Sequence, residues 1–197
     1  MKKVLIINAH QKHDGVAEGK LTNTIISSAK DFFNSKNFEI EETNIDKSYD
    51  IKEEVEKFAW ADYIFMQYPV FWMGLPWKAK KYVDEIFMEG MSTVTFSNDG
   101  RSRDDKSKRY GTGGLMQEKK YMLSLTYNCP VEEFSSKEGF FDGLSLDEAN
   151  YAVHKVFQFC GAKQLETYAM HDIFKGDLDI ISELKQLNTI LENNFKG

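Results

Sequence analysis

The residues best suited to chemistry in this chain are those that could bind a phosphorylated ligand. Residues 9–25, AHQKHDGVAEGKLTNTI, lead into a predicted helix, and the free N–H groups at a helix start favour phosphate. Gly19, Leu21, Thr22 and Thr24 offer amides and hydroxyls there. The segment lacks the GK[ST] of a Walker A loop and the spacing of a GxGxxG fingerprint. An ordinary solvated loop, with Thr22 capping the helix, is the alternative interpretation.

A second candidate segment, Pro69-Val70-Phe71-Trp72, is aromatic and almost free of polar side chains. Proline fixes φ and removes an N–H group, so a rigid backbone here would offer selected amides to a ligand. Phe71 and Trp72 are suited to form an apolar wall beside a planar ring. Packing of these aromatic side chains into the core beneath the next helix is the alternative.

Two further segments carry weaker signals of a binding site. Residues 110–114, YGTGG, hold three glycines that permit close approach of backbone to a ligand, although a flexible turn explains them equally well. Residues 126–129, TYNC, end a predicted strand, where Thr126 and Asn128 supply polar groups and Tyr127 a ring. We expect no catalytic thiol at Cys129, because no obvious base accompanies it.

Other common catalytic patterns are missing from the sequence. There is no Ser-His-Asp or nucleophile-elbow pattern, and no telling pair of carboxylates at strand ends. His10 and His13 could contact phosphate or ribose, but two histidines three positions apart in a loop are a weak metal signal. We therefore predict no metal site.

The elements that must position these segments alternate between strand and helix. The predicted strands are residues 3–8, 38–45, 63–68, 120–127 and 164–170, and the predicted helices are 21–33, 51–61, 77–89, 147–160 and 177–194. Asp177 is the expected N-cap of the last helix, and Gly161 the expected C-cap of the helix before it. Five alternations predict an α/β protein, one domain over residues 1–197, with a five-stranded parallel sheet and helices on both faces. Ligands bind such sheets beyond the carboxyl ends of the strands.

Length and composition narrow the function further. The 197 residues carry a net charge of −6, which disfavours nucleic acid as a main partner. No apolar run approaches a membrane span, and two distant cysteines exclude a disulfide scaffold. We therefore expect a cytoplasmic protein without membrane insertion. The aromatic fraction of 14% is high, as expected for an interface or a stacking site.

With these residues assembled, the chain resembles the flavodoxin-like NAD(P)H:quinone oxidoreductases. The resemblance rests on KVLIINAH, on WADYIFMQYPVFWMGLPWKAKKYVDEIF, on DGRSRDDKSKRYGTGGLMQEKKYMLSLTYNCP and on FFDG. It implies a flavodoxin-like three-layer fold, bound FAD, NADPH as electron donor, a quinone substrate, and a homodimer with active sites at the subunit interface. By position, the FAD-contacting residues would be Ala17, Gly19, Leu21, Thr22, Thr24, Pro69, Val70, Phe71, Trp72, Tyr110, Thr126, Tyr127, Asn128 and Cys129.

The resemblance also implies a mechanism, in which NADPH reduces the flavin and a quinone then takes its place and accepts two electrons. Tyr127 is the candidate catalytic residue, and Phe134, Phe140 and Phe141 are candidates to line the quinone slot. The basic run 101–109 is a candidate to attract the extra phosphate of NADPH. Three alternatives stay open: reduction of nitro or azo compounds, regulation of a potassium efflux system, and an FMN-holding electron carrier, although the TxTGxT run typical of such carriers is absent.

Overall fold

The computed structural model describes residues 1–175 and 177–195, so Gly176 and the last two residues of the predicted domain lie outside it. Its sheet is parallel throughout, with strands in the order β2-β1-β3-β4-β5 and with β6 also beside β4. The strands are β1 Lys3–Asn8, β2 Glu39–Asn44, β3 Tyr63–Pro69, β4 Lys120–Thr126, β5 Lys163–Gln164 and β6 Tyr168–Met170. This is the flavodoxin-like order, in which the chain changes direction between β1 and β3.

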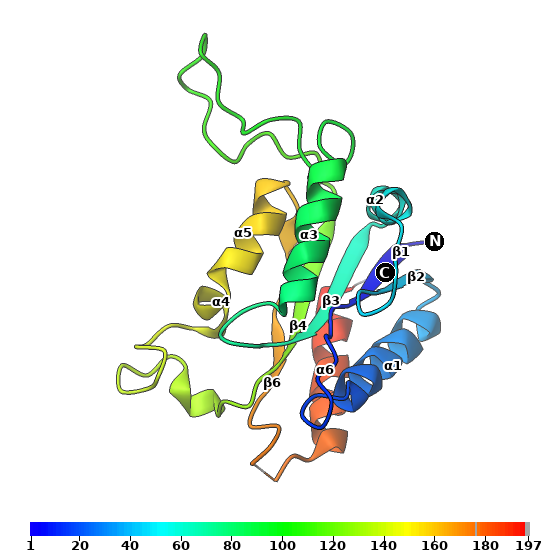
Figure 1. Ribbon diagram of the computed structural model, residues 1–197, viewed down its shortest axis with the longest axis vertical. Coiled ribbons are helices and arrows are strands. Elements are labelled where there is room, and N and C mark those ends of the chain that lie inside the picture. Colours follow the sequence, from blue (N-terminus) through cyan, green and yellow to red (C-terminus); the bar gives the residue numbers. More distant parts are fainter. Residues whose placement is uncertain (176, 196–197) are drawn as a thin grey trace.

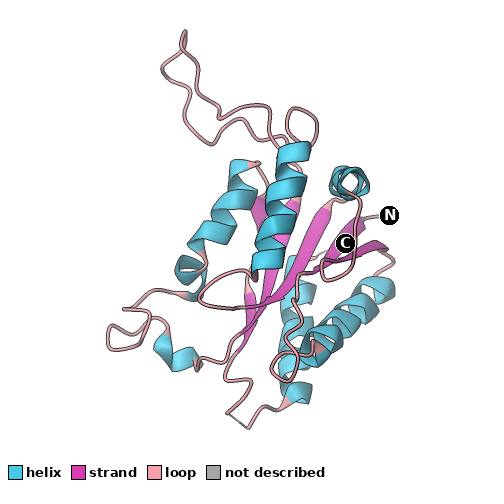
Figure 2. Ribbon diagram, in the orientation of Figure 1, coloured by secondary structure: helices cyan, strands magenta, loops and turns pink. Residues whose placement is uncertain are grey.

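Helices cover both faces of the sheet, as predicted (Figures 1 and 2). They are α1 Lys20–Ser35, α2 Ile51–Trp60, α3 Trp77–Glu89, α4 Leu146–Ala149, α5 Tyr151–Phe159 and α6 Ile180–Asn194, with a 3₁₀ turn at Val131–Glu133. Helices α1 and α6 pack on one face, and α2, α3 and α5 on the other. None of the helices in the described part of the chain combines the length and the apolarity needed to cross a bilayer.

The sheet holds two apolar cores because its central strands are buried on both faces. Alternate residues of β1 and β3, such as Leu5 and Ile64, enter the core beneath α2 and α3. Their neighbours, such as Ile6 and Phe65, enter the core beneath α1 and α6. This two-sided burial explains why these strands appear in the sequence as continuous apolar runs.

Three predicted elements differ from the observed ones. The fifth strand is interrupted, so β5 and β6 share the place beside β4. The predicted helix 147–160 divides at Asn150, which lies between α4 and α5. The last helix is capped by Asp179, whose carboxylate accepts the N–H groups of Ile181 and Ser182, and not by Asp177. Charge and position suit both aspartates, and only the path of the loop selects one.

The predicted end of α5 is confirmed. Gly161 has φ +91, its N–H donates to Gln158, and the next N–H, of Ala162, donates to Phe157. These bonds form a Schellman motif, which needs a left-handed residue that glycine adopts without strain.

Candidate functional site

The loops at the carboxyl ends of β1, β3, β4 and β6 surround a cavity of about 330 Å³, which we call the edge cavity. This is the edge at which the doubly wound sheet predicts a ligand. Nine residues predicted to bind the cofactor line it: Ala17, Gly19, Leu21, Thr22, Pro69, Val70, Phe71, Thr126 and Asn128. Three segments far apart in the sequence therefore meet at one site.

The start of α1 faces this cavity without a cap. Its N-cap residue, Gly19, has no side chain to accept the free N–H groups, and the first turn holds no acidic residue. Lys20 places a positive charge at the same end, where the helix dipole disfavours a cation. Thr22, the residue proposed from sequence as an ordinary cap, is instead buried near His10. An anion bound here would satisfy both the free N–H groups and the charge of Lys20.

His10 holds the loop that leads to α1. Its Nε2 lies 3.0 Å from the carbonyl oxygen of Ala17, so the proton of the neutral ring is on Nε2. Burial lowers the pKa of His10, which keeps the ring neutral at pH 7. Gly19 has φ +81, and a Cβ there would lie 3.1 Å from the His10 ring. The close approach and the left-handed backbone both require glycine.

The aromatic segment after β3 divides into two parts. Pro69, Val70 and Phe71 line the cavity. Trp72 and Met73 form a tight turn, closed by reciprocal backbone hydrogen bonds between Phe71 and Gly74. Both central residues have positive φ, 49° and 66°, as in a type I′ turn, which ordinarily favours Asn-Gly. The side chain of Trp72 is 97% exposed and does not line the cavity, contrary to the prediction of an apolar wall at this residue.

Tyr127 points away from the edge cavity, although its neighbours Thr126 and Asn128 line it. Its hydroxyl accepts a hydrogen bond of 2.9 Å from Nδ2 of the buried Asn150. Burial raises the pKa of Tyr127. A strand places successive side chains on opposite faces, and Tyr127 lies on the face covered by α3 and α5. This geometry argues against the catalytic proton transfer assigned to Tyr127 from sequence.

If Tyr127 has no part in the chemistry that the resemblance implies, replacing it with Phe should keep the turnover with NADPH within about twofold of that of the parent protein. The protein should lose about 1–3 kcal/mol of stability, because one buried N–H of Asn150 loses its acceptor. Steady-state kinetics and urea unfolding of the same preparation test both parts. A loss of turnover beyond about tenfold, with the stability unchanged, would instead support a catalytic role for the Tyr127 hydroxyl.

Thr24 and Cys129 do not line the edge cavity either. The hydroxyl of Thr24 donates to the carbonyl of Lys20 within α1. Burial is the main cause of a raised pKa for the Cys129 thiol, so little reactive thiolate forms at neutral pH. In the described part of the chain, no group of three or more His, Cys, Asp and Glu side chains is arranged to hold a metal.

Tyr110 and the glycines after it lie at the opposite edge of the sheet. Residues 90–119 connect the end of α3 to the start of β4, and they project beyond the end of α3 that is remote from the edge cavity (Figure 1). The 13 residues of α3 separate the two edges by about 20 Å. Tyr110 therefore cannot contact a ligand in the edge cavity of its own chain.

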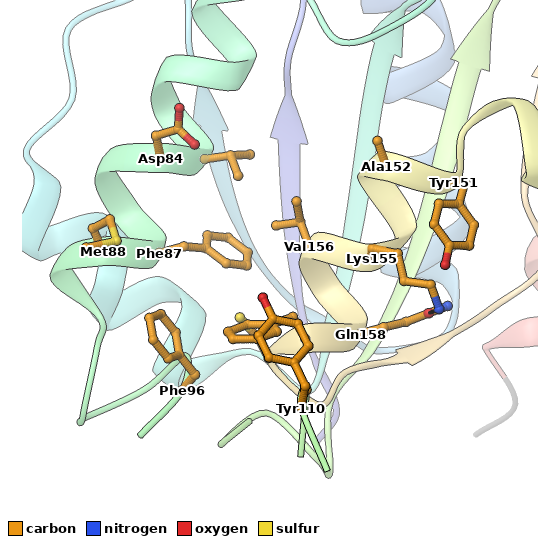
Figure 3. A pocket seen from close by; sticks show the side chains of 14 residues that line it. Asp84, Phe87, Met88, Phe96, Tyr110, Tyr151, Ala152, Lys155, Val156 and Gln158 are labelled. Carbon is orange, nitrogen blue, oxygen red and sulfur yellow. Dashed lines mark hydrogen bonds between the residues drawn. The ribbon is translucent and has the colours of Figure 1, made fainter. Parts of the chain in front are cut away.

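Tyr110 instead lines a second hollow, of about 690 Å³, between α3 and α5. Phe87, Phe96 and Tyr110 gather around it (Figure 3), and Tyr110 packs against Phe159 with ring centroids 5.3 Å apart. We call this hollow the α3–α5 groove. Its lining is mainly apolar, and Tyr110 itself is 68% exposed.

The edge cavity also contains residues beyond those named individually from the sequence. Glu18 and Lys20 lie within the predicted phosphate-binding stretch 17–24, whereas His10, Val16, Ile173 and Phe174 lie outside the predicted cofactor-binding stretches. His10 was considered only as a possible phosphate or ribose contact. The loop after the fifth strand was expected at this edge, but no residue in it stood out by type. The available signal is Phe174, the one Phe, Tyr or Trp in residues 171–179.

Comparisons with known proteins agree with this architecture. Residues 2–190 match the family model described as flavodoxin-like fold. The chain is 39% identical to the NADPH:quinone oxidoreductase MdaB of Haemophilus influenzae, over 82% of this chain and 84% of that protein. It is 38% identical to an uncharacterised protein of Schizosaccharomyces pombe, over 95% and 96% of the two chains.

Among solved structures, an FMN-dependent NADH-azoreductase of Bacillus anthracis in complex with FMN has a TM-score of 0.63 to this chain. It shares 18% identity, over 98% of this chain and 97% of that one, a level that reports on the fold alone. The matches to the family model and to the Haemophilus protein extend over most of the sequence. The chain therefore belongs to the flavodoxin-like family, in the group that contains the NADPH:quinone oxidoreductase of H. influenzae.

Proposed function

We propose that this protein is a cytoplasmic, FAD-dependent NAD(P)H:quinone oxidoreductase with its flavin in the edge cavity. The observation that carries the proposal is the uncapped start of α1, which opens into a cavity with an apolar wall at Val70 and Phe71. The phosphate of a flavin would bind at the uncapped start of α1, and its flat ring system would lie against the apolar wall. The 39% identity to a protein named NADPH:quinone oxidoreductase supports the same activity.

The residues present fit such a cofactor. The free N–H groups after Gly19 would hold phosphate. The absence of a side chain at Gly19 lets the start of α1 pack against the His10 ring, which a Cβ would approach to 3.1 Å. The backbone of Pro69–Phe71 and the side chains of Thr126 and Asn128 would surround the ring. Thr126 and Asn128 are the polar side chains available to stabilise negative charge that develops on a reduced ring.

The bound flavin would supply the hydride chemistry, accepting two electrons from NAD(P)H and passing two electrons to a quinone. The chain would orient the ring and keep one of its faces covered. We propose that the nucleotide and the quinone occupy the exposed side in turn. Of the three phenylalanines predicted to line the quinone slot, we propose this role for Phe140, which is exposed. Phe134 is buried against the Tyr127 ring and stacks on Phe141, so these two would support the slot from the core.

This function predicts a yellow purified protein that releases FAD on denaturation and reduces menadione with NADPH. Occupation of one place in turn predicts ping-pong kinetics, hence parallel lines in double-reciprocal plots. Mass spectrometry of the released cofactor and initial-rate kinetics provide the measurements. Intersecting lines would contradict the shared place, and a colourless, inactive protein would contradict the function.

Two other functions remain testable by the same preparation. Azo and nitro compounds are the second candidates as electron acceptors, and a panel of acceptors at equal concentration would rank them against quinones. Regulation of a potassium efflux system would be favoured if the protein were colourless and co-purified with a membrane transporter.

We further propose that the protein is a homodimer in which Tyr110 serves the partner's edge cavity. Large apolar side chains are exposed at both ends of α3: Trp72, Met73 and Trp77 at its start, and Met88, Met91 and Tyr110 at its end. A two-fold axis perpendicular to α3 would place the start of α3 in one chain beside the end of α3 in the other. The exposed apolar patch at the start of each helix would then be covered by the patch at the end of its partner, once on each side of the axis. The same arrangement would bring Tyr110 of each chain to the other chain's cavity edge.

Complementation between two defective chains tests this arrangement. Tyr110→Ala and Gly19→Ala should each lower activity as homodimers. Co-expressed with different tags and purified as the mixed dimer, they should recover about half of the parent activity, because one of the two sites then combines an intact Gly19 with an intact Tyr110. Recovery would not occur if Tyr110 acted within its own chain, and a monomer in sedimentation experiments would exclude the dimer.

A further inference from the structure

A smaller hollow, of about 200 Å³, continues the α3–α5 groove toward the loop that follows β3. Ala152 and Val156 of α5 line both hollows. On α3, Lys80 lines the smaller hollow, and Val83 and Asp84 line the larger one a turn later, on the same face of the helix. The two hollows therefore form one depression along the facing sides of α3 and α5, part of which Figure 3 shows. We call it the extended groove.

The extended groove is apolar at its base and polar at its rim. The buried side chains at the base are Val83, Phe87, Val153 and Cys160. The charged side chains in the lining already have partners: Lys80 pairs with Asp84 at 2.5 Å. Likewise, the Lys155 ammonium donates to Gln158 at 2.7 Å. A long, uncharged, apolar ligand matches this lining, because it would cover the base without disturbing the pairs at the rim.

One end of the extended groove adjoins the edge cavity. Gly74 lines the groove, whereas Phe71 lines the edge cavity. These two residues exchange two backbone hydrogen bonds, of 3.0 and 3.1 Å, so a single tight turn separates the two sites. The side chains in the middle of that turn, Trp72 and Met73, are large, apolar and 97% and 56% exposed. An apolar chain that crosses the turn from one site to the other therefore stays on apolar surface.

We infer that the extended groove binds the isoprenoid tail of a prenylated quinone whose ring is reduced at the edge cavity. This inference rests on the proposed function, and it names the substrate class as lipid quinones with a polyprenyl chain. The part of α3 that lines the groove runs from Lys80 to Met88, a length of about 12 Å along the helix. This length suits an extended chain rather than a compact ligand. Quinones without a tail use the same ring site and lose this contact.

Quinones with the same ubiquinone ring and a tail of zero, two or four isoprene units, in one detergent, provide the kinetic test. In the parent protein, kcat/KM for the quinone should rise about tenfold at each step, because each unit buries more apolar surface. Ala152→Trp places a large ring at an exposed position where the two hollows join. It should remove most of the gain from the tail and leave kcat/KM for the tail-less quinone within about twofold.

A matched control and a binding measurement accompany the kinetics. Ala59→Trp makes the same change at an exposed alanine of α2 that lines neither hollow, and it should behave like the parent protein. Equilibrium dialysis with tritiated farnesol tests the groove without any quinone ring. The parent protein and Ala59→Trp should bind farnesol equally, and Ala152→Trp should bind it about tenfold more weakly.

The outcomes separate this inference from the proposed function. If the parent protein reduces all three quinones with equal kcat/KM or does not bind farnesol, or if Ala152→Trp lowers kcat/KM equally for all three, the inference alone is overturned. A lower dimer affinity of Ala152→Trp in sedimentation experiments, with the tail dependence unchanged, would assign the groove to a second copy of the chain and also overturn it. If the parent protein reduces no quinone, the proposed function fails together with the inference, even if farnesol binds.

Discussion

Replacing Gly19 with Ala is expected to weaken flavin binding by about 10- to 100-fold, or roughly 1.4–2.8 kcal/mol. The backbone of Gly19 is left-handed, with φ +81, and its added Cβ would meet the His10 ring at 3.1 Å. To avoid that contact, either His10 gives up its hydrogen bond to Ala17 or the start of α1 turns away from the cavity. Both changes displace the N–H groups that would hold the phosphate. Fluorescence titration with FAD measures the loss.

The matched control is Gly15→Ala in the same loop. Gly15 also has a left-handed backbone, with φ +72, but a Cβ there has nothing within 4 Å. Both variants should lose about 1–2 kcal/mol of stability from backbone strain, and only Gly19→Ala should lose flavin affinity. Equal affinities for the two variants would show that the contact with His10 is irrelevant to the site.

Replacing Glu54 with Ala should destabilise the protein by about 3–5 kcal/mol, the usual cost of breaking a buried ion pair by removing one partner. Glu54 is 2% exposed, and its carboxylate accepts hydrogen bonds from Thr43, Tyr82 and Lys57, at 2.5, 2.7 and 2.6 Å. The three donors come from β2, α3 and α2. The buried hydroxyls of Thr43 and Tyr82 would lose this acceptor, and the Lys57 ammonium would lose its carboxylate partner. Urea unfolding followed by circular dichroism measures the change.

Two variants separate the buried network from a general effect on α2. Glu54→Gln keeps an acceptor for the hydroxyls but leaves the Lys57 charge unpaired, so its loss of stability should be intermediate. Glu53→Ala changes the adjacent, exposed residue in the same turn and should cost no more than about 1 kcal/mol, through the helix dipole. An unfolding midpoint of Glu54→Ala equal to that of Glu53→Ala would contradict a structural role for the network.

Much of the fold could be predicted from local sequence patterns. The continuous apolar runs of β1, β3 and β4 appear as strands because the central strands of a parallel sheet are buried on both faces. Helix α3 begins and ends at the predicted residues, Trp77 and Glu89, where a proline precedes it and a glycine follows. The alternation of these elements predicts a ligand site at the carboxyl edge, and the edge cavity lies at that edge.

The direction in which a loop side chain points could not be predicted from such local patterns. Thr126, Tyr127 and Asn128 are consecutive, yet the first and third line the edge cavity while Tyr127 bonds Asn150 on the other face. Trp72 appeared from its type to be a cavity wall, but a turn with two positive φ angles directs it into solvent. In both cases the backbone path decides the outcome, and the residue type is compatible with either one.

The sequence by itself determined the order of strands and helices, and with it the edge of the sheet at which a cofactor would bind. Only the tertiary structure decided which residues meet there. It brought Phe174 to the cavity from a loop 155 residues after Gly19, and it placed Tyr110 at the far edge, in the hollow between α3 and α5. Periodicity reports which face of an element is buried, whereas the neighbours of a loop residue depend on how distant elements pack.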